Sequence, residues 1–143
     1  MTVFALDSNI VSFVMKNREP VKSRLLDTPA ENVAIPSIVL AELCYGRHNN
    51  PVRSAHLGLA IQQFKDCYPI LDFNASAAEW YGMIRFETRE QPVGDRDLLI
   101  AAICLAHGCT LVTHNTREFE RIPGLHTVDW TKPLPKVPGP RRR

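Results

Sequence analysis

The sequence predicts a three-layer α/β/α sandwich around a central, mainly parallel sheet. Short apolar runs of the kind that form buried strands alternate along the chain with longer segments of helical periodicity. Alternating strands and helices favour parallel pairing with right-handed crossovers, which place helices on both faces of the sheet. The length of 143 residues suits one domain with one core. We predict that this domain covers residues 1–131 and that residues 132–143 form a flexible tail rich in Pro and Arg.

The first strand is predicted in the apolar run that starts at Val3 and stops at Asp7. Ser8 or Asn9 can then cap a helix that continues to about Val14. An acid at the carboxyl end of a strand lies where open α/β sheets bind their ligands. The alternative is that Asp7 is an ordinary turn or helix-capping residue. Partners from elsewhere in the chain decide between the two.

The remaining elements follow from the same two periodicities, with Pro and Gly marking the boundaries. The helix predicted to begin at 95–97 is apolar almost all round from Leu98 to Ala106 and is therefore expected to be buried. After the first helix, the prediction gives a helix from 19–20 to 28–29, a strand at 32–36, a helix from Ser37 to Gly46 and a helix from the turn at 49–51 to about 67. A strand at 69–73 follows, then a helix from Asn74 or Ser76 to about 87 and a helix from 95 to Gly108. The chain continues with a strand at 109–113, a short helix at 118–120 and an edge strand at 126–130.

Composition excludes several classes of protein. A hydrophobic fraction of 45% and a charged fraction of 22% are typical of globular domains, and a net charge of +2 is too small to indicate nucleic-acid binding by itself. The apolar runs are too short to span a bilayer and no secretion signal opens the chain, which predicts a cytoplasmic protein. The four cysteines lack zinc-site spacing. We interpret Cys44 and Cys104 as buried free thiols.

Three carboxylates are predicted to lie together: Asp7, Glu42 and Asp97. Glu42 shares a helix face with Val39 and Tyr45, and Asp97 lies in the first turn of the buried helix. Burial of a carboxylate is costly unless a cation or hydrogen bonds compensate it. No Lys or Arg stands at a matching helical position, which indicates a metal ion as the shared partner.

Carboxylate oxygens favour Mg²⁺ or Mn²⁺ over zinc. Such ions bind phosphates and assist hydrolysis of phosphodiesters by water. Thr113 and Asn115, at the end of the fourth strand, are placed to orient the water or to add a ligand. Taken singly, Asp97 can simply complement a helix N-terminus, which is worth about 0.3–1 kcal/mol, and Glu42 can be solvated. The joint placement of the acids favours a site.

Other charged residues near these loops carry two interpretations each. His114 is either a proton carrier or a structural residue. Glu118 and Glu120 are either surface residues or a source of one further acid at the site. The arginines that flank the loops either contact phosphates of a nucleic acid or belong to a solvated surface of mixed charge. They are Arg85, Arg89, Arg96, Arg117 and Arg121.

These motifs resemble the PIN-domain family, and specifically the VapC-type toxin ribonucleases of bacterial toxin–antitoxin pairs. The resemblance extends over nearly the whole chain as far as Trp130 and depends on the order and spacing of several motifs. They are Leu6 to Asn9, Ile38 to Gly46 with Ala41-Glu42-Leu43, Pro92 to Asp97 with Ile100 to Ala102, Leu111 to Asn115, and Glu118 to Leu125.

The resemblance implies that Asp7, Glu42 and Asp97 hold Mg²⁺ or Mn²⁺ and that Thr113 and Asn115 line the same catalytic site. Many family members have an Asp where this chain has Asn115. The identity of a fourth acid therefore stays open between Glu118 and Glu120.

The resemblance also implies the activity and the partners. Proteins of this kind are metal-dependent endoribonucleases that hydrolyse RNA, often a structured tRNA, and form homodimers neutralised by a cognate VapB-type antitoxin. An alternative is a DNA-directed or structure-specific nuclease on the same fold. Another is a degenerate PIN-like domain that only binds RNA or a protein, although the intact acids at positions 7, 42 and 97 argue against it.

Overall fold

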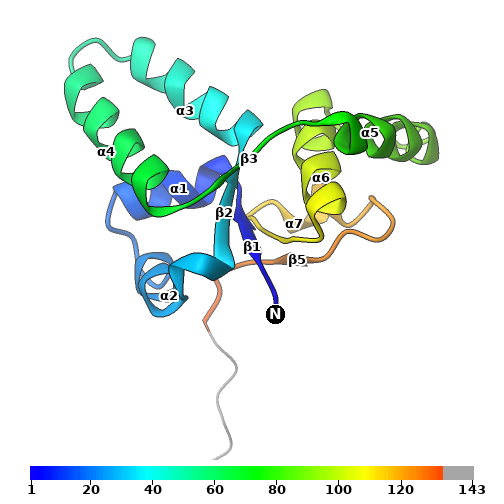
Figure 1. Ribbon diagram of the computed structural model, residues 1–143, viewed down its shortest axis with the longest axis horizontal. Helices are drawn as coiled ribbons and strands as arrows, with labels where there is room; N and C mark the ends of the chain where they lie inside the picture. Colours follow the sequence, from blue (N-terminus) through cyan, green and yellow to red (C-terminus); the bar gives the residue numbers. More distant parts are fainter. Residues whose placement is uncertain (134–143) are drawn as a thin grey trace, which may run out of the picture.

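The computed structural model describes residues 1–133, and the rest of the predicted tail lies outside the described residues. The strands are β1 (Phe4–Leu6), β2 (Val33–Pro36), β3 (Ile70–Leu71), β4 (Thr110–Val112) and β5 (Thr127–Val128). They form one sheet in the order β3-β2-β1-β4-β5, and every neighbouring pair is parallel (Figure 1). β1 is therefore the middle strand, and β5 lies at an edge as predicted.

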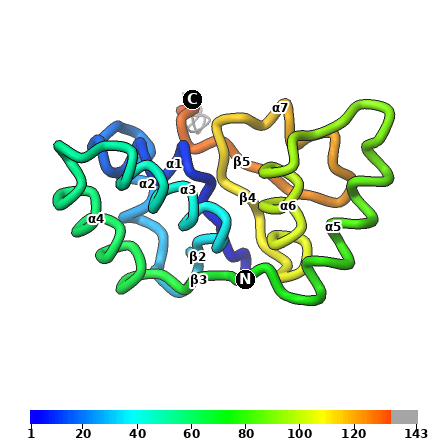
Figure 2. Tube along the Cα trace, turned by 90° about the horizontal axis from the view of Figure 1, so that it is seen from above, coloured from blue at the N-terminus to red at the C-terminus, as the bar shows by residue number. Residues whose placement is uncertain are grey.

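Two groups of helices cover the sheet. The helices are α1 (Ser8–Met15), α2 (Val21–Asp27), α3 (Ser37–His48), α4 (Ser54–Cys67), α5 (Ala75–Glu87), α6 (Asp95–His107) and α7 (Thr116–Phe119). Figure 2 shows α1 to α4 on one side of the sheet and α5 to α7 on the other. Right-handed crossovers explain this division, because the chain moves from β1 outward to β3 and then returns past β1 to β4 and β5. The predicted three-layer sandwich is confirmed.

The core lies around β1 and α6. Leu6 in the middle strand and Ile100 and Ile103 in α6 are fully buried, as are Leu111 on β4 and Phe119 on α7. The prediction that α6 is buried is confirmed, because most of its residues from position 97 to 104 are inaccessible to solvent. Truncation of such a side chain to Ala typically costs about 2–5 kcal/mol. The apolar middle of the sheet therefore holds the strands in place and positions the polar residues at the strand ends.

One of two helix ends predicted at a glycine was wrong in detail. α3 does not end at Gly46 but continues to His48, and the amide of Asn49 still donates to the carbonyl of Tyr45 at 2.9 Å. Gly46 permits a left-handed termination without requiring one. Gly108, in contrast, adopts φ of +68° and ends α6 as predicted.

The caps also differ from the prediction in part. α1 is capped by Asp7 rather than by Ser8 or Asn9, because a carboxylate oxygen of Asp7 accepts the amide hydrogen of Ser8 at 2.8 Å. Of the two candidates for α5, Asn74 is the cap.

The two cysteines that were interpreted as buried differ. Cys104 is buried in α6, whereas Cys44 is exposed on α3. The face of α3 that packs against the rest of the protein therefore differs from the one that the apolar pattern of its sequence predicted. None of the helices within residues 1–133 has both the length and the hydrophobicity that a bilayer crossing needs.

Candidate active site

The three acids predicted to lie together come from three elements at the carboxyl edge of the sheet. Asp7 directly follows β1, Asp97 lies in the first turn of α6, and Glu42 lies in the middle of α3. The connections from β1 and into β4 run on opposite faces of the sheet, so the gap between these two strands is a topological switch point. Ligand sites of open α/β sheets form at such points. We call Asp7, Glu42 and Asp97 the acidic cluster.

The side chain of Asp7 is held by two donors. Leu6 pairs with Val112 across the sheet, so the next residues of the two strands, Asp7 and Thr113, are neighbours. The hydroxyl of Thr113 donates to one carboxylate oxygen of Asp7 at 2.7 Å, and the amide of Ser8 donates to the other at 2.8 Å. Asp7 is only 3% exposed. It is therefore a helix cap and a buried strand-end acid at once.

Thr113 links Asp7 to the next turn of the chain. Its side chain is fully buried, and its hydroxyl accepts the amide hydrogen of Asn115 at 3.0 Å while donating to Asp7. Asn115 thus reaches the acidic cluster through its backbone. Its side chain is exposed at the start of α7 and makes no hydrogen bond within residues 1–133.

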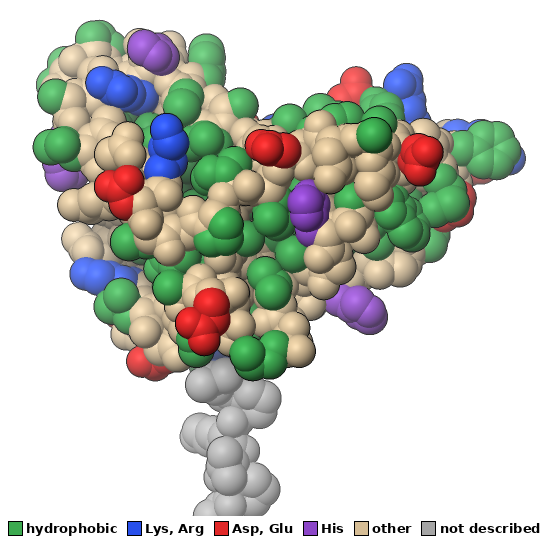
Figure 3. All heavy atoms as spheres, viewed as in Figure 1, with side chains coloured by type: hydrophobic (Ala, Val, Ile, Leu, Met, Phe, Trp, Pro, Cys, Tyr) green, Lys and Arg blue, Asp and Glu red, His purple; other side chains and the backbone are tan. Residues whose placement is uncertain are grey.

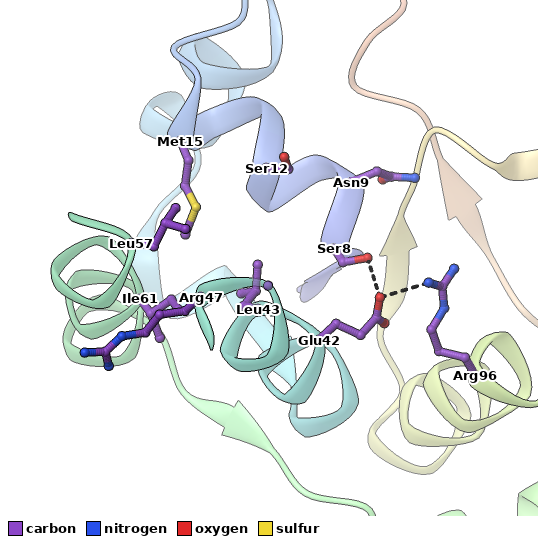
Figure 4. A pocket seen from close by; sticks show the side chains of 11 residues that line it. Ser8, Asn9, Ser12, Met15, Glu42, Leu43, Arg47, Leu57, Ile61 and Arg96 are labelled. Carbon is purple, nitrogen blue, oxygen red and sulfur yellow. Dashed lines mark hydrogen bonds and ion pairs between the residues drawn. The ribbon is translucent and has the colours of Figure 1, made fainter. Parts of the chain in front are cut away.

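Glu42 has one paired oxygen and one unpaired oxygen. Its Oε2 accepts hydrogen bonds from the hydroxyl of Ser8 at 3.1 Å and from Arg96 at 2.9 Å, as the dashed lines in Figure 4 show. Its Oε1 is buried and has no hydrogen-bond partner in the described part of the chain. Burial raises the pKa of Glu42, against the opposing charge of Arg96. A buried oxygen without a donor is costly, and a cation would satisfy it.

Asp97 is also buried, with 8% of its surface exposed. Burial raises its pKa, the charge of Arg96 opposes the rise, and the charges of Asp7 and Glu118 add to it. Arg96 lies 3.5 Å from Asp97 Oδ1. The carboxylates of the acidic cluster therefore lie close enough to repel one another in a partly dry environment.

No Lys or Arg stands three or four positions from Glu42 or Asp97 on its own helix, as predicted, but a basic partner reaches these acids from another position. Arg96 precedes Asp97 directly on α6 and reaches across to Glu42 on α3, 54 residues away in the sequence. The predicted face of α3 was wrong in part, because Val39 is buried but Tyr45 is 70% exposed.

The chemistry of the acidic cluster fits a hard divalent cation better than zinc. All of the side-chain atoms that it offers to an ion are carboxylate oxygens, and the unpaired Oε1 of Glu42 is one of them. As the side chains stand, no three His, Cys, Asp or Glu residues among positions 1–133 are close enough to enclose a metal ion. The guanidinium of Arg96 instead bridges Glu42 and Asp97.

The two candidates for a further acid occupy different positions. Glu118 is half-buried, pairs with Arg121 at 3.8 Å, and its charge contributes to the raised pKa of Asp97. Glu120 is exposed. His114 does not contact the acidic cluster; its Nδ1 lies 3.3 Å from a carboxylate oxygen of Asp129.

Most of the remaining arginines of the predicted set have local partners on a surface of mixed charge. Arg85 donates to the Tyr81 hydroxyl, and Arg89 stacks on the Phe86 ring at 3.9 Å from its centroid. Arg117 is exposed. Figure 3 shows acidic and basic side chains scattered over the viewed face rather than gathered into one patch.

A groove of about 440 Å³ runs from the acidic cluster between α1, α3 and α4, and sequence reasoning missed it. Its polar end is formed by Ser8, Asn9, Glu42 and Arg96, whereas Met15, Leu43, Leu57 and Ile61 form its apolar end (Figure 4). The groove depends on how three helices pack, so no single segment of the sequence carries a signal for it.

Comparison with known proteins agrees with this geometry. A family model described as PIN domain matches residues 4–125. The tRNA(fMet)-specific endonuclease VapC of Shigella flexneri is 38% identical over 133 residues, which cover 92% of this chain and 100% of that protein. Ribonuclease VapC2 of Rickettsia felis is 35% identical, over 91% of this chain and 99% of that protein.

Solved structures give the same assignment. The crystal structure of VapBC2 from Rickettsia felis bound to a DNA fragment from their promoter has a TM-score of 0.83 at 34% identity and covers 90% of this chain and 99% of that chain. The structure of DNA-bound VapBC from Salmonella typhimurium has a TM-score of 0.83 at 35% identity, over 91% of this chain and 99% of that chain. The resemblance inferred from the sequence motifs is thus confirmed, and the chain belongs to the PIN-domain family, within the group of VapC ribonucleases.

Proposed function

We propose that this chain is a divalent-metal-dependent endoribonuclease that acts as the toxin of a toxin–antitoxin pair. The observation that carries the proposal is the acidic cluster, in which the buried Oε1 of Glu42 has no donor within residues 1–133. The similarity to VapC ribonucleases over more than nine-tenths of the chain supports the same activity.

Asp7, Glu42 and Asp97 would hold the cation, Mg²⁺ or Mn²⁺. When bound, it supplies positive charge that polarises the phosphodiester and lowers the pKa of water. The hydrogen bonds from Ser8 and Thr113 keep the Asp7 carboxylate in one orientation, so little reorganisation is needed when the substrate arrives. Glu42 and Asp97 add oxygen atoms from two further helices.

We assign the role of fourth acid to Glu118, because its charge acts on Asp97 while Glu120 is exposed. In this proposal, the side-chain amide of Asn115 orients the attacking water. A matched pair of variants tests the assignment of the acid. Glu118→Gln should lower the cleavage rate and Glu120→Gln should leave it unchanged, and the reverse ranking would reject Glu118.

The proposed substrate is RNA, with the initiator tRNA as the first candidate, because one relative is named a tRNA(fMet)-specific endonuclease. The proposed protein partner is a VapB-type antitoxin, since similar chains were solved as VapBC complexes. We further propose a homodimer in the cytoplasm and a Pro- and Arg-rich tail outside the nuclease domain.

The test is cleavage of total cellular RNA and of synthetic tRNA(fMet) by the purified chain, freed of antitoxin, with Mg²⁺ and with EDTA. Discrete products that require both the metal and Asp7, judged with Asp7→Asn, are expected. Equal cleavage of single-stranded DNA would favour the DNA-directed alternative. Absence of any metal-dependent cleavage by folded protein would favour a binding domain.

A further inference from the structure

Within residues 1–133, Arg96 is the basic residue that contacts the acidic cluster. One guanidinium nitrogen lies 2.9 Å from Glu42 Oε2 and another lies 3.5 Å from Asp97 Oδ1. The charges of Glu42, Asp97 and Asp7 all act on it. Figure 4 shows the guanidinium directed toward Glu42 from the first turn of α6. A single positive charge therefore spans two acids that come from different helices.

The three partners differ in how freely they move. The Arg96 side chain is 57% exposed, whereas those of Glu42 and Asp97 are 23% and 11% exposed. Arg96 also lines the groove beside the acidic cluster, so it has open space on one side. The acids are fixed by the fold, and Arg96 is the partner that is able to leave.

We propose that Arg96 acts as an internal counter-ion of the acidic cluster and that a divalent cation binds there in exchange for its guanidinium. This inference rests on the proposed metal site. Without the cation, Arg96 offsets part of the repulsion among the three carboxylates. When the cation binds, the Arg96 guanidinium loses its contacts with Glu42 and Asp97 and moves to a position inside the groove.

The short distance between Mg²⁺ and its ligand oxygens and the repulsion between Mg²⁺ and the guanidinium both support this exchange. Mg²⁺ demands ligand oxygens at about 2.0–2.1 Å with near-octahedral geometry. The guanidinium occupies the space between Glu42 and Asp97, and no three His, Cys, Asp or Glu side chains within residues 1–133 form a group that could hold a metal ion. A guanidinium and a divalent ion in the same small site would also repel each other.

The first experiment is titration calorimetry of the full chain with Mn²⁺, comparing the unaltered protein with Arg96→Gln. Removal of the competing guanidinium should tighten Mn²⁺ binding by about threefold to tenfold, because the cation then no longer has to break two partly exposed ion pairs. Arg96→Lys, which keeps the charge but loses the fork geometry, should lie between the two. Arg89→Gln is the matched control, because it removes the same charge from a residue that contacts Phe86 and Glu90.

The second experiment follows the Arg96 guanidinium itself by NMR, with its signals identified by their absence in Arg96→Gln. Saturating Mg²⁺ should move these signals to the positions of a solvated arginine. Asp7→Asn, which lacks one proposed ligand, should show no such movement. Guanidinium signals that stay unchanged while Mg²⁺ binds would overturn the exchange.

The outcomes separate this inference from the proposed function. Equal Mn²⁺ affinities in the unaltered chain and Arg96→Gln would overturn the role of Arg96 and leave the metal site intact. Weaker binding in Arg96→Gln, with an unchanged melting curve, would show that Arg96 organises the acids rather than competing for them. Failure of both proteins to bind Mn²⁺ would overturn the metal site and the exchange together.

Discussion

The carboxylate of Asp129 and the acidic cluster lie at the same edge of the sheet but differ in how many hydrogen-bond donors surround them. Asp129 follows β5 much as Asp7 follows β1, but it is surrounded by donors: Thr131 donates its amide hydrogen at 2.9 Å and its hydroxyl at 2.6 Å, and His114 lies at 3.3 Å. Burial alone would raise the pKa of Asp129, yet these hydrogen bonds outweigh burial and lower it.

Two members of the acidic cluster, Glu42 and Asp97, show the reverse balance. Burial raises the pKa of Glu42 and of Asp97 despite the charge of Arg96, and one oxygen of Glu42 has no donor in the described chain. Asp129 has its charge satisfied by local donors and stabilises a turn. Glu42 and Asp97 have too few donors to offset their burial, and a cation would relieve that shortage.

The largest expected effect is on catalysis. Asp7→Asn should lower RNA cleavage by about 10²- to 10³-fold, because several kcal/mol of transition-state stabilisation by the cation depend on this ligand. Its melting temperature should fall by only a few degrees, since the single amide oxygen keeps the hydrogen bond from Ser8 while the bond from Thr113 to the second oxygen is lost. Asp129→Asn is the matched control and should cleave RNA at the normal rate. Equal losses in both variants would erase the distinction between the two regions.

A smaller effect is expected on stability when the cation is added. A ligand at 100 times its Kd stabilises the folded state by about 2.7 kcal/mol. Saturating Mg²⁺ should therefore raise the melting temperature of the unaltered chain and of Asp129→Asn alike. Asp97→Asn should show little increase. A full increase in Asp97→Asn would place the cation elsewhere.

Removal of the charge at Asp129 should weaken the fold instead. Asp129→Asn replaces charge-assisted hydrogen bonds by neutral ones, at an expected cost of about 1 kcal/mol. Urea denaturation followed by circular dichroism measures this cost. Thr131→Val, which removes the hydroxyl donor from the other side, should cost a similar amount. An unchanged midpoint in both variants would contradict a structural role for this turn.

The smallest effect is a pair of opposite pH dependences. The raised pKa values mean that Glu42 and Asp97 favour folding below their ordinary values of 4.5 and 3.8, and that this contribution is lost as the pH rises through the folded values. The stabilisation from Asp129, whose pKa is lowered, is present above 3.8 and is lost as the pH falls through its folded value.

Melting curves of the metal-free protein test these signs. Asp97→Asn should raise the melting temperature slightly near neutral pH and converge with the unaltered chain at about pH 4. Asp129→Asn should lower it near neutral pH and converge at low pH. Two variants that respond to pH in the same direction would show that burial and donor number do not separate the two regions.

The sequence by itself determined the order of the elements, the buried first strand and the buried α6, because these depend on local periodicity and on Pro and Gly at boundaries. It also placed Asp7 and Asp97, since a residue that follows a strand or opens a helix is fixed by that one element. The parallel sheet followed from the alternation of strands and helices.

Only the tertiary structure decided which charges meet. Glu42 and Arg96 are separated by 54 positions, and their contact depends on how far α3 extends, which face it turns inward and how closely it approaches α6. The choice of Glu118 as the acid that acts on Asp97 likewise depends on the packing of α7. Periodicity describes one element at a time, whereas a distance between two side chains is set by all the elements that pack between them.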